Sequence, residues 1–296
     1  MTTIAPPAQP PIDLLRRAKR IGYVFSGGSS RCAFQVGVIE ELRRVGIQPA
    51  LTIGVSAGAW NAAIVSARIE SRIRYYWRSF MRMPHVDLRK VLVDHTPYRF
   101  RELHARTFER FIGQRLHAAD ALPLFVGVTR LRDGRPAIID ARQVEDPLTL
   151  LLASNYLPPF YTHAPEIQGE RYGDGGMSDN APYEKAFDEG CDAVVLVALK
   201  GESEGDLSRS PRDGDHRIPE PYASRTIVIR PRHRVPVSFT ERRWAVLEQL
   251  IHLGELRTRE VLFGERHEAT ELRASGPAPS ARVMNFIRTT RSLFRH

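Results

Sequence analysis

Ser56 stands between two glycines in a pattern that suits a catalytic nucleophile. The stretch reads Gly54-Val55-Ser56-Ala57-Gly58, and it joins residues 49–53, which suit a short buried strand, to residues 57–65, which suit a closely packed helix. A Gly-x-Ser-x-Gly sequence between a strand and a helix is a nucleophile elbow, which turns the serine hydroxyl out of the sheet beside the helix N-terminus. The stretch therefore predicts a serine that attacks acyl carbon atoms. The simpler interpretation is a tight turn without chemistry.

A glycine-rich loop over residues 26–32 is the second chemical feature. It follows the apolar residues 21–25 and precedes residues 33–44, whose apolar positions recur with helical spacing. Such a loop presents backbone N–H groups and a helix dipole to an anion. It lacks both the Gly-Lys-Ser/Thr ending of a P-loop and the Gly-x-Gly-x-x-Gly pattern of dinucleotide sites. We therefore favour an oxyanion hole for Ser56 over a nucleotide site, and a plain turn is the other alternative.

Asp174 is the third chemical feature, and it is followed by Gly175 and Gly176. The two glycines leave its carboxylate little shielded and allow the backbone to turn tightly, although an Asp-Gly hairpin turn would need no chemistry. A histidine could complete a Ser-Asp-His order, and His233 follows a predicted strand closely enough to do so. A surface histidine in a basic loop is the competing interpretation of His233.

Two successive strand–loop–helix units must position these residues. They predict an α/β fold with a parallel, doubly wound sheet, whose sites lie at the carboxyl ends of the strands. Further buried strands are predicted over residues 124–129, 136–140, 192–199 and 226–230, and helices over residues 13–20, 148–154 and 241–263. Asp13 and Asp146 are the expected N-caps of the first two of these helices.

Composition limits the classes of protein. The chain has 296 residues, of which 42% are hydrophobic, so a sizeable core is expected. Its two cysteines, Cys32 and Cys191, lack metal-ligand spacing, so neither a zinc site nor any other metal or cofactor is expected. No secretory h-region and no run of 18 apolar residues occurs. A cytoplasmic protein with free thiols is therefore predicted, with peripheral membrane contact as an open alternative.

The net charge of +9 favours anionic partners. Residues 72–82 alternate arginine with aromatic side chains, which would suit either base stacking or an amphipathic helix over the core. We favour the helix, so no nucleic-acid partner is expected. Residues 281–296 carry apolar side chains on one helical face and arginines beside it, which suits either contact with an anionic membrane or docking on the domain.

Three motifs occur in an order that resembles the patatin-like phospholipase family. They are Gly27-Gly28-Ser29-Ser30-Arg31-Cys32, the Ser56 elbow and Asp174-Gly175-Gly176, and residues 33–38 and 153–160 are also similar to the family. The resemblance implies a three-layer α/β/α fold with a mostly parallel central sheet and a C-terminal helical extension. Together with the proline-rich composition of the first residues, it suggests a flexible Pro-rich leader over 1–18, a catalytic domain over 19–232 and the extension over 233–296.

The resemblance also implies a mechanism. Ser56 would be the nucleophile of a serine acyl hydrolase, Asp174 its general base, and the substrate an acyl ester of a phospholipid or a related lipid. The oxyanion-hole loop would comprise Gly27, Gly28, Ser29 and Arg31, and the remaining motif glycines would be Gly54, Gly58, Gly175 and Gly176. The family has glycine where this chain has Ser29 and Cys32. These departures leave open an alternative, a catalytically weak or inactive lipid-binding regulator on the same fold.

Overall fold

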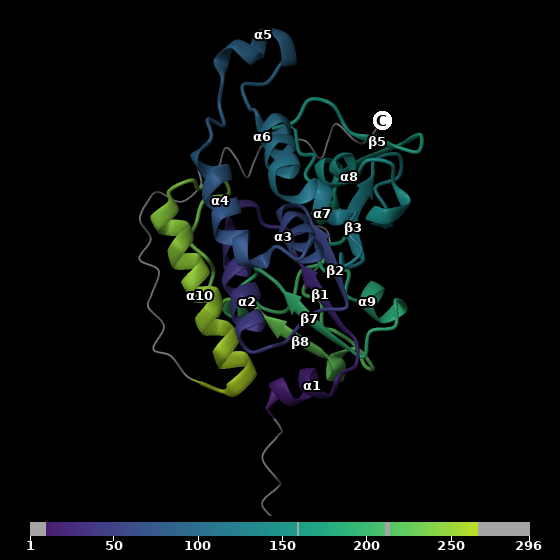
Figure 1. Cartoon of the computed structure of the whole chain (residues 1–296), viewed down its shortest axis with the longest axis vertical. Coiled ribbons are helices and arrows are strands. Elements are labelled where there is room, and N and C mark those ends of the chain that lie inside the picture. Colours follow the sequence, from purple (N-terminus) through teal and green to yellow (C-terminus); the bar gives the residue numbers. More distant parts are fainter. Residues whose placement is uncertain (1–9, 159, 211–213, 266–296) are drawn as a thin grey trace, which may run out of the picture.

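The computed structural model describes residues 10–158, 160–210 and 214–265 (Figure 1). These residues form an eight-stranded mixed sheet in the order β5-β6-β3-β2-β1-β7-β8, with β4 paired to β3. The strands that pair in parallel are β1 (Ile21–Phe25), β2 (Leu51–Val55), β3 (Leu124–Arg130), β7 (Ala193–Val197) and β8 (Thr226–Ile229). The antiparallel strands are β4 (Pro136–Asp140) and β6 (Glu170–Asp174), which both pair with β3, and β5 (Glu166–Ile167), which pairs with β6.

The sheet register places the three predicted motifs together. Phe25, the last residue of β1, lies opposite Gly54 of β2, so the glycine-rich loop and the elbow leave the sheet at one edge. Val128 of β3 lies opposite Asp174, the last residue of the antiparallel strand β6. Asp174 therefore reaches the same edge from the other direction along the sheet.

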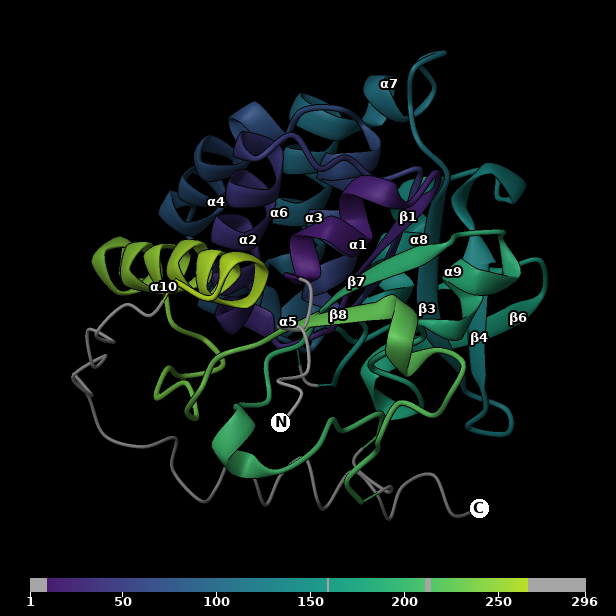
Figure 2. The same ribbon diagram turned by 90° about the horizontal axis from the view of Figure 1, so that it is seen from below.

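Helices cover both faces of the sheet, as Figure 2 shows, and together they make three layers. Alternate residues of each strand point to opposite faces, so Tyr23 and Phe25 enter the larger core while Val24 enters the smaller one. The larger core lies under α2 (Ala33–Arg44), α3 (Ala57–Ser66), α4 (Ile73–Arg82), α6 (Phe100–Thr107), α8 (Pro147–Ser154) and α10 (Trp244–Phe263). The smaller core lies under α9 (Glu184–Asp188). The predicted three-layer fold is confirmed.

Helix α10 packs directly on α2 along the edge of the larger core (Figure 1). A methyl group added at Gly37 of α2 would overlap the carbonyl oxygen of Ile251, and one added at Gly254 would overlap the carbonyl oxygen of Phe34. Two helix backbones come this close only where glycine stands at the crossing. Within the described residues, the predicted C-terminal extension thus contributes a helix to the same layer as α2 and α3.

The N-terminal helix differs from its prediction. Helix α1 (Pro11–Arg17) begins two residues earlier than expected, and Asp13 lies in its first turn rather than at its N-cap. Proline at the first helical position explains the early start, because its missing N–H costs nothing there. Ile12 and Leu15 are buried, so this part of the predicted flexible leader is folded against the core. The remainder of the leader, residues 1–9, and the predicted tail helix over residues 281–296 lie outside the described residues.

Helix α4 follows the interpretation that we favoured for residues 72–82. Tyr76, Trp77 and Phe80 are buried, and Arg74 forms ion pairs with Glu40 and Glu255. These three rings are enclosed in the core and cannot stack on nucleic-acid bases, whereas Tyr75 of the same helix is exposed. The rest of this largely helical region contains α5 (Val91–Asp94), α6, a π-helical turn (Phe108–Ile112) and α7 (Gly113–Leu116). In the described part of the chain, the helices are all too short or too polar to span a bilayer.

Candidate active site

Ser56 occupies a strained turn between β2 and α3. Its φ is 53° and its ψ is −131°, a left-handed conformation that L-residues rarely adopt. The flanking glycines make the turn feasible. A methyl group on Gly54 would overlap the Cα of Ala59, and one on Gly58 would lie 2.5 Å from the carbonyl oxygen of Ser26. The elbow predicted from the sequence is therefore the observed geometry, with Ser56 just before the first turn of α3.

The hydroxyl of Ser56 donates a hydrogen bond of 2.6 Å to Oδ2 of Asp174. The other carboxylate oxygen, Oδ1, accepts the backbone N–H of Gly176 at 2.8 Å. Only 4% of Asp174 is exposed. Burial raises the pKa of this carboxyl to about 6, and the hydrogen bonds from Ser56 and Gly176 oppose the rise. The two residues thus form a direct Ser–Asp pair, with the carboxylate more basic than an exposed aspartate.

The backbone of Asp174 is held at the end of β6 from both sides. The Thr129 hydroxyl donates to its carbonyl oxygen at 2.7 Å, and its own N–H donates to the carbonyl oxygen of Tyr156 at 3.1 Å. The backbone at Gly175 crosses so close to β3 that a side chain there would overlap the carbonyl oxygen of Gly127. The Asp-Gly-Gly sequence therefore begins a 3-10 turn (Gly175–Met177) packed against β3 and not an exposed hairpin turn.

Ser154 and Asn155, at the end of α8, hold the elbow in place. The N–H of Ser56 donates to the Ser154 hydroxyl at 2.7 Å, and that hydroxyl donates to the carbonyl oxygen of Gly127 at 2.6 Å. The Asn155 amide donates to the carbonyl oxygen of Ser56 at 3.0 Å. Sequence reasoning assigned neither residue a role. Its one available signal was the family-like segment over residues 153–160.

Gly27 has a different part in the glycine-rich loop from the one expected. Its N–H donates to Oδ1 of Asn180 at 2.6 Å, and the Asn180 amide donates back to the Gly27 carbonyl at 3.3 Å. Gly27 thus belongs to the predicted oxyanion-hole loop, but its N–H is already bonded to Asn180. Any side chain at Gly27 would also lie 2.6 Å from the Cβ of Ser56. Asn180, which sequence reasoning did not single out, is thus a positioning residue.

The next peptide group, between Gly28 and Ser29, is oriented by Arg31. The Gly28 carbonyl accepts the Arg31 backbone N–H at 3.2 Å and its Nε at 3.4 Å. In a trans peptide the N–H of Ser29 then points the opposite way. Among the described residues, no hydrogen bond uses the N–H of Gly28 or Ser29, so both remain available to an oxyanion. Arg31 therefore shapes the loop and does not line the cavity described below.

The two departures from the family pattern are accommodated in different ways. Ser29 takes a φ of 52°, where glycine would be favoured, and its hydroxyl donates to the carbonyl oxygen of Phe239 at 2.6 Å. The hydroxyl of Ser30 donates to the same oxygen at 3.0 Å. Cys32 is completely buried beneath the loop, with its Sγ 3.6 Å from the carbonyl oxygen of Ser26. The loop therefore keeps its turn, and the Ser29 and Ser30 hydroxyls bind it to Phe239 in the segment before α10.

The family model described as patatin-like phospholipase matches residues 23–187, a span that contains both Ser56 and Asp174. The chain belongs to the patatin-like phospholipase family. The curated relative "Uncharacterized protein YjjU" of Escherichia coli K12 is 29% identical over 194 residues, which cover 60% of this chain and 51% of the relative. The chain thus spans about half the length of the curated relative that it matches.

Solved structures with similarity to this patatin-like chain include two bacterial proteins. VipD of Legionella pneumophila has a TM-score of 0.46 and 14% identity, and the match covers 82% of this chain and 67% of VipD. ExoU of Pseudomonas aeruginosa, a type III secretion protein solved in complex with SpcU, has a TM-score of 0.42 and 16% identity, with 85% of this chain and 54% of ExoU covered.

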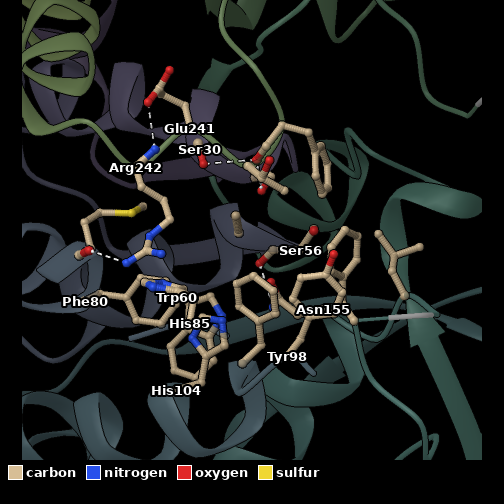
Figure 3. Close-up of a pocket in the computed structure, with 18 of the residues that line it drawn as sticks. Ser30, Ser56, Trp60, Phe80, His85, Tyr98, His104, Asn155, Glu241 and Arg242 are labelled. Atoms are coloured by element: carbon tan, nitrogen blue, oxygen red, sulfur yellow. Dashed lines mark hydrogen bonds between the residues drawn. The ribbon is translucent and has the colours of Figure 1, made fainter. Parts of the chain in front are cut away.

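A cavity of about 290 Å³ opens beside Ser56 and Asp174 in this patatin-like fold. Figure 3 shows Ser56 and Asn155 at one side of it and the rings of Trp60, Phe80 and His104 gathered together. Most of the residues that line it are aromatic or apolar: Ala57, Trp60, Tyr76, Trp77, Phe80, Met81, Val86, Tyr98, Phe100, Leu157, Phe160, Tyr161 and Phe239. Such a lining suits an apolar chain that extends away from the serine.

The histidines of the cavity are not the one that sequence reasoning considered. His85 and His104 line it, whereas His233 does not. His104 lies between Trp60 and Phe80, with ring centroids 4.3 and 4.6 Å away, and burial lowers its pKa to about 3. Burial also lowers the pKa of His85 to about 4. The Ser56 hydroxyl bonds directly to Asp174 and His233 does not line the cavity, so the structure gives no support to a Ser-Asp-His arrangement through His233. Across the described residues, no group of three or more His, Cys, Asp or Glu side chains could hold a metal ion.

Proposed function

We propose that this protein is a serine acyl hydrolase that cleaves acyl esters of phospholipids or related lipids through a Ser56–Asp174 dyad. The observation that carries the proposal is the 2.6 Å hydrogen bond between the Ser56 hydroxyl and the buried Asp174 carboxylate, at the wall of an apolar cavity. Membership of the patatin-like phospholipase family supports the lipid class of the substrate.

In the first half of the reaction, Oγ of Ser56 attacks the ester carbonyl carbon while its proton passes to Oδ2 of Asp174. The N–H groups of Gly28 and Ser29 stabilise the negative charge on the carbonyl oxygen. When the tetrahedral intermediate collapses, the bond to the leaving alkoxide breaks and Asp174 returns the proton to it. The products of this half are a free alcohol, such as a lysolipid, and an acyl-enzyme on Ser56.

The second half repeats these steps with water. Asp174 takes a proton from the water as its oxygen attacks the acyl carbon, and the same backbone donors hold the oxyanion. Collapse releases the fatty acid, and Ser56 recovers its proton from Asp174. A carboxyl with a pKa of about 6 suits this work, because it is ionised at neutral pH and still more basic than an exposed aspartate.

The cavity supports an acyl chain as the part of the substrate that lies next to Ser56. Its aromatic wall offers apolar contact, and its two histidines are neutral at physiological pH because their pKa values are lowered by burial. The Ser29 and Cys32 departures do not favour the alternative of an inactive regulator, because the Ser29 hydroxyl is bonded to Phe239 and Cys32 is buried. We also propose that the catalytic unit continues through α10 rather than ending at residue 232, since Gly37 and Gly254 join α2 to α10.

Labelling by a fluorophosphonate probe together with hydrolysis of p-nitrophenyl esters and phospholipid vesicles tests this proposal. Wild type should be labelled and should release fatty acid, whereas Ser56→Ala and Asp174→Asn should lose both activities. The matched controls are Ser224→Ala and Asp120→Asn, which change exposed residues away from the cavity. An unlabelled wild type, or a Ser56→Ala variant with full activity, would refute the dyad.

A further inference from the structure

Residues 85–99 leave the core between α4 and α6 and return to it, forming a projection that we call the 85–99 excursion. Its base is closed by backbone hydrogen bonds from Asp87 to Pro97 at 2.8 Å and from Arg99 to His85 at 3.0 Å. Figure 1 shows its short helix α5 standing away from the body of the molecule. The excursion is therefore fastened at its base and projects into solvent at its tip.

The tip of the excursion is apolar and exposed. Leu88 is 75% exposed and Leu92 is 88% exposed. Of the large hydrophobic side chains that are exposed in the described residues, four belong to the excursion and one, Tyr75, lies outside it: Val86, Leu88, Val91, Leu92 and Tyr75. Single exposed apolar residues are ordinary, but a group confined to one projecting segment indicates a surface that contacts something apolar.

Basic side chains lie on the excursion and beside its base. Arg89 and Arg101 are exposed, and no ion pair involves either of them in the part of the chain that the structure describes. Lys90 and Arg99 both pair with Glu102 at the base. An apolar surface flanked by arginines is complementary to an anionic lipid interface, where apolar groups enter the acyl boundary and cations meet the phosphates.

The base of the excursion is also the wall of the cavity beside Ser56. His85, Val86 and Tyr98 line that cavity, and so does Phe100, the first residue of α6. A second cavity of about 230 Å³ lies against it, lined by basic residues Lys90, Arg99 and Arg101 and sharing Tyr98, Phe160 and Tyr161 with the first. The surface that would meet a bilayer is thus continuous with the site that would receive an acyl chain.

We propose that the 85–99 excursion docks this protein on anionic lipid bilayers, with Leu88, Val91 and Leu92 entering the interface and Arg89 and Arg101 contacting headgroup phosphates. Docking there brings the cavity beside Ser56 next to the lipid. This inference deepens the proposed function. It rests on that function for the reason why the protein would dock on lipid, but binding to vesicles can be measured without hydrolysis.

Sedimentation with vesicles tests the proposal on the full chain. The probes are vesicles of phosphatidylglycerol and phosphatidylcholine in a 3:7 ratio and vesicles of phosphatidylcholine alone. Wild type and Ser56→Ala should both bind the anionic vesicles, and added salt should weaken the binding. Leu88→Asp/Leu92→Asp and Arg89→Gln/Arg101→Gln should each reduce the affinity about tenfold or more.

Matched controls separate docking from folding and from general charge. Tyr75→Asp changes the exposed apolar residue outside the excursion, and Arg132→Gln/Arg171→Gln removes two exposed arginines elsewhere. Both should bind like wild type, and thermal melting should show all variants folded. The proposal is overturned if wild type does not bind anionic vesicles, if the excursion variants bind as tightly as wild type, or if the controls lose as much affinity.

Two further outcomes are distinct. If the excursion variants change the oligomeric state measured by sedimentation velocity, a second copy of this chain occupies the tip and the lipid proposal fails. If wild type and Ser56→Ala bind vesicles equally but wild type hydrolyses no ester, docking stands and the proposed hydrolase function fails. The two proposals can therefore be rejected separately.

Discussion

The backbone N–H of Ser56 donates a hydrogen bond to the hydroxyl of Ser154, which lies 98 residues later in the chain. The hydroxyl of Ser154 in turn donates a hydrogen bond to the carbonyl oxygen of Gly127, so one buried hydroxyl connects the elbow to the central strand β3. A nucleophile needs a fixed position with respect to its base as well as a favourable pKa. This hydrogen bond fixes the position of Ser56, and it stabilises a backbone conformation with a φ of 53° that is otherwise unfavourable.

Ser154 does not contact the substrate in the proposed reaction, but Ser154→Ala should impair catalysis because Ser154 positions Ser56. The variant leaves the Ser56 N–H without its partner in a buried site, so we expect a loss of about 1–3 kcal/mol in stability. Looser positioning of Ser56 should lower kcat about ten- to hundredfold with little change in KM. Ester kinetics and thermal melting measure the two effects.

The control for this variant is Ser66→Ala. Ser66 is also buried and also donates to a carbonyl oxygen, that of Leu122 at 2.6 Å, but it lies at the far end of α3 from the elbow. Its substitution should lower stability by a similar amount and leave kcat unchanged. Equal losses of kcat in both variants would show that Ser154 acts only through overall stability.

The pH dependence of catalysis should report the protonation of Asp174. A general base works only when ionised, and the pKa of Asp174 in the free protein is raised to about 6 by burial. We therefore expect kcat/KM to be constant above this pH and to fall about tenfold per pH unit below it. A rate profile between pH 4 and 9 with a soluble ester provides the measurement. A profile flat down to pH 4 would contradict the assignment.

Asp174→Asn should stabilise the fold while abolishing hydrolysis. The carboxyl has a higher pKa in the folded protein than in the unfolded chain, so its ionisation opposes folding. This penalty is absent below a pH of about 4, grows between about 4 and 6, and reaches roughly 3 kcal/mol above that range. The neutral amide avoids it, so the gain in melting temperature over wild type should grow as pH rises from 4 to 7.

The exposed Asp120→Asn variant serves as the control for that measurement. The pKa of Asp120 is lowered, chiefly by its hydrogen bond with Arg115, so removing its charge should give no stabilisation at pH 7. If Asp174→Asn melted below wild type at pH 7 and at pH 4 alike, the buried charge would not be the source of strain at the site.

Ser29 offers a test of the oxyanion loop. Both Ser29→Ala and Ser29→Gly remove the hydrogen bond to Phe239, but only alanine keeps a Cβ at a φ of 52°. Glycine tolerates that conformation, so Ser29→Gly should be more stable than Ser29→Ala by about 1 kcal/mol. Chemical denaturation measures this difference. Equal stabilities would mean that the left-handed turn costs nothing.

Local sequence signals determined much of this protein. The strands at residues 21–25 and 124–130, the helix at 33–44 and the cap at Asp146 follow from apolar periodicity and from turn chemistry, which act over a few residues. The elbow at Ser56 was also readable, because its glycines and its flanking strand and helix are neighbours in the chain. The order of the motifs was enough to indicate the family.

Tertiary structure decided which atoms are free to act. Asn180 accepts the Gly27 N–H, and Ser154 holds the elbow, through contacts between residues far apart in sequence. Burial sets the pKa of Asp174, and the Gly37–Gly254 crossing brings α10 into the domain. Such effects depend on how strands register and helices cross, so no local pattern of residue types encodes them. The sequence identified the chemical groups, whereas packing determined their availability and strength.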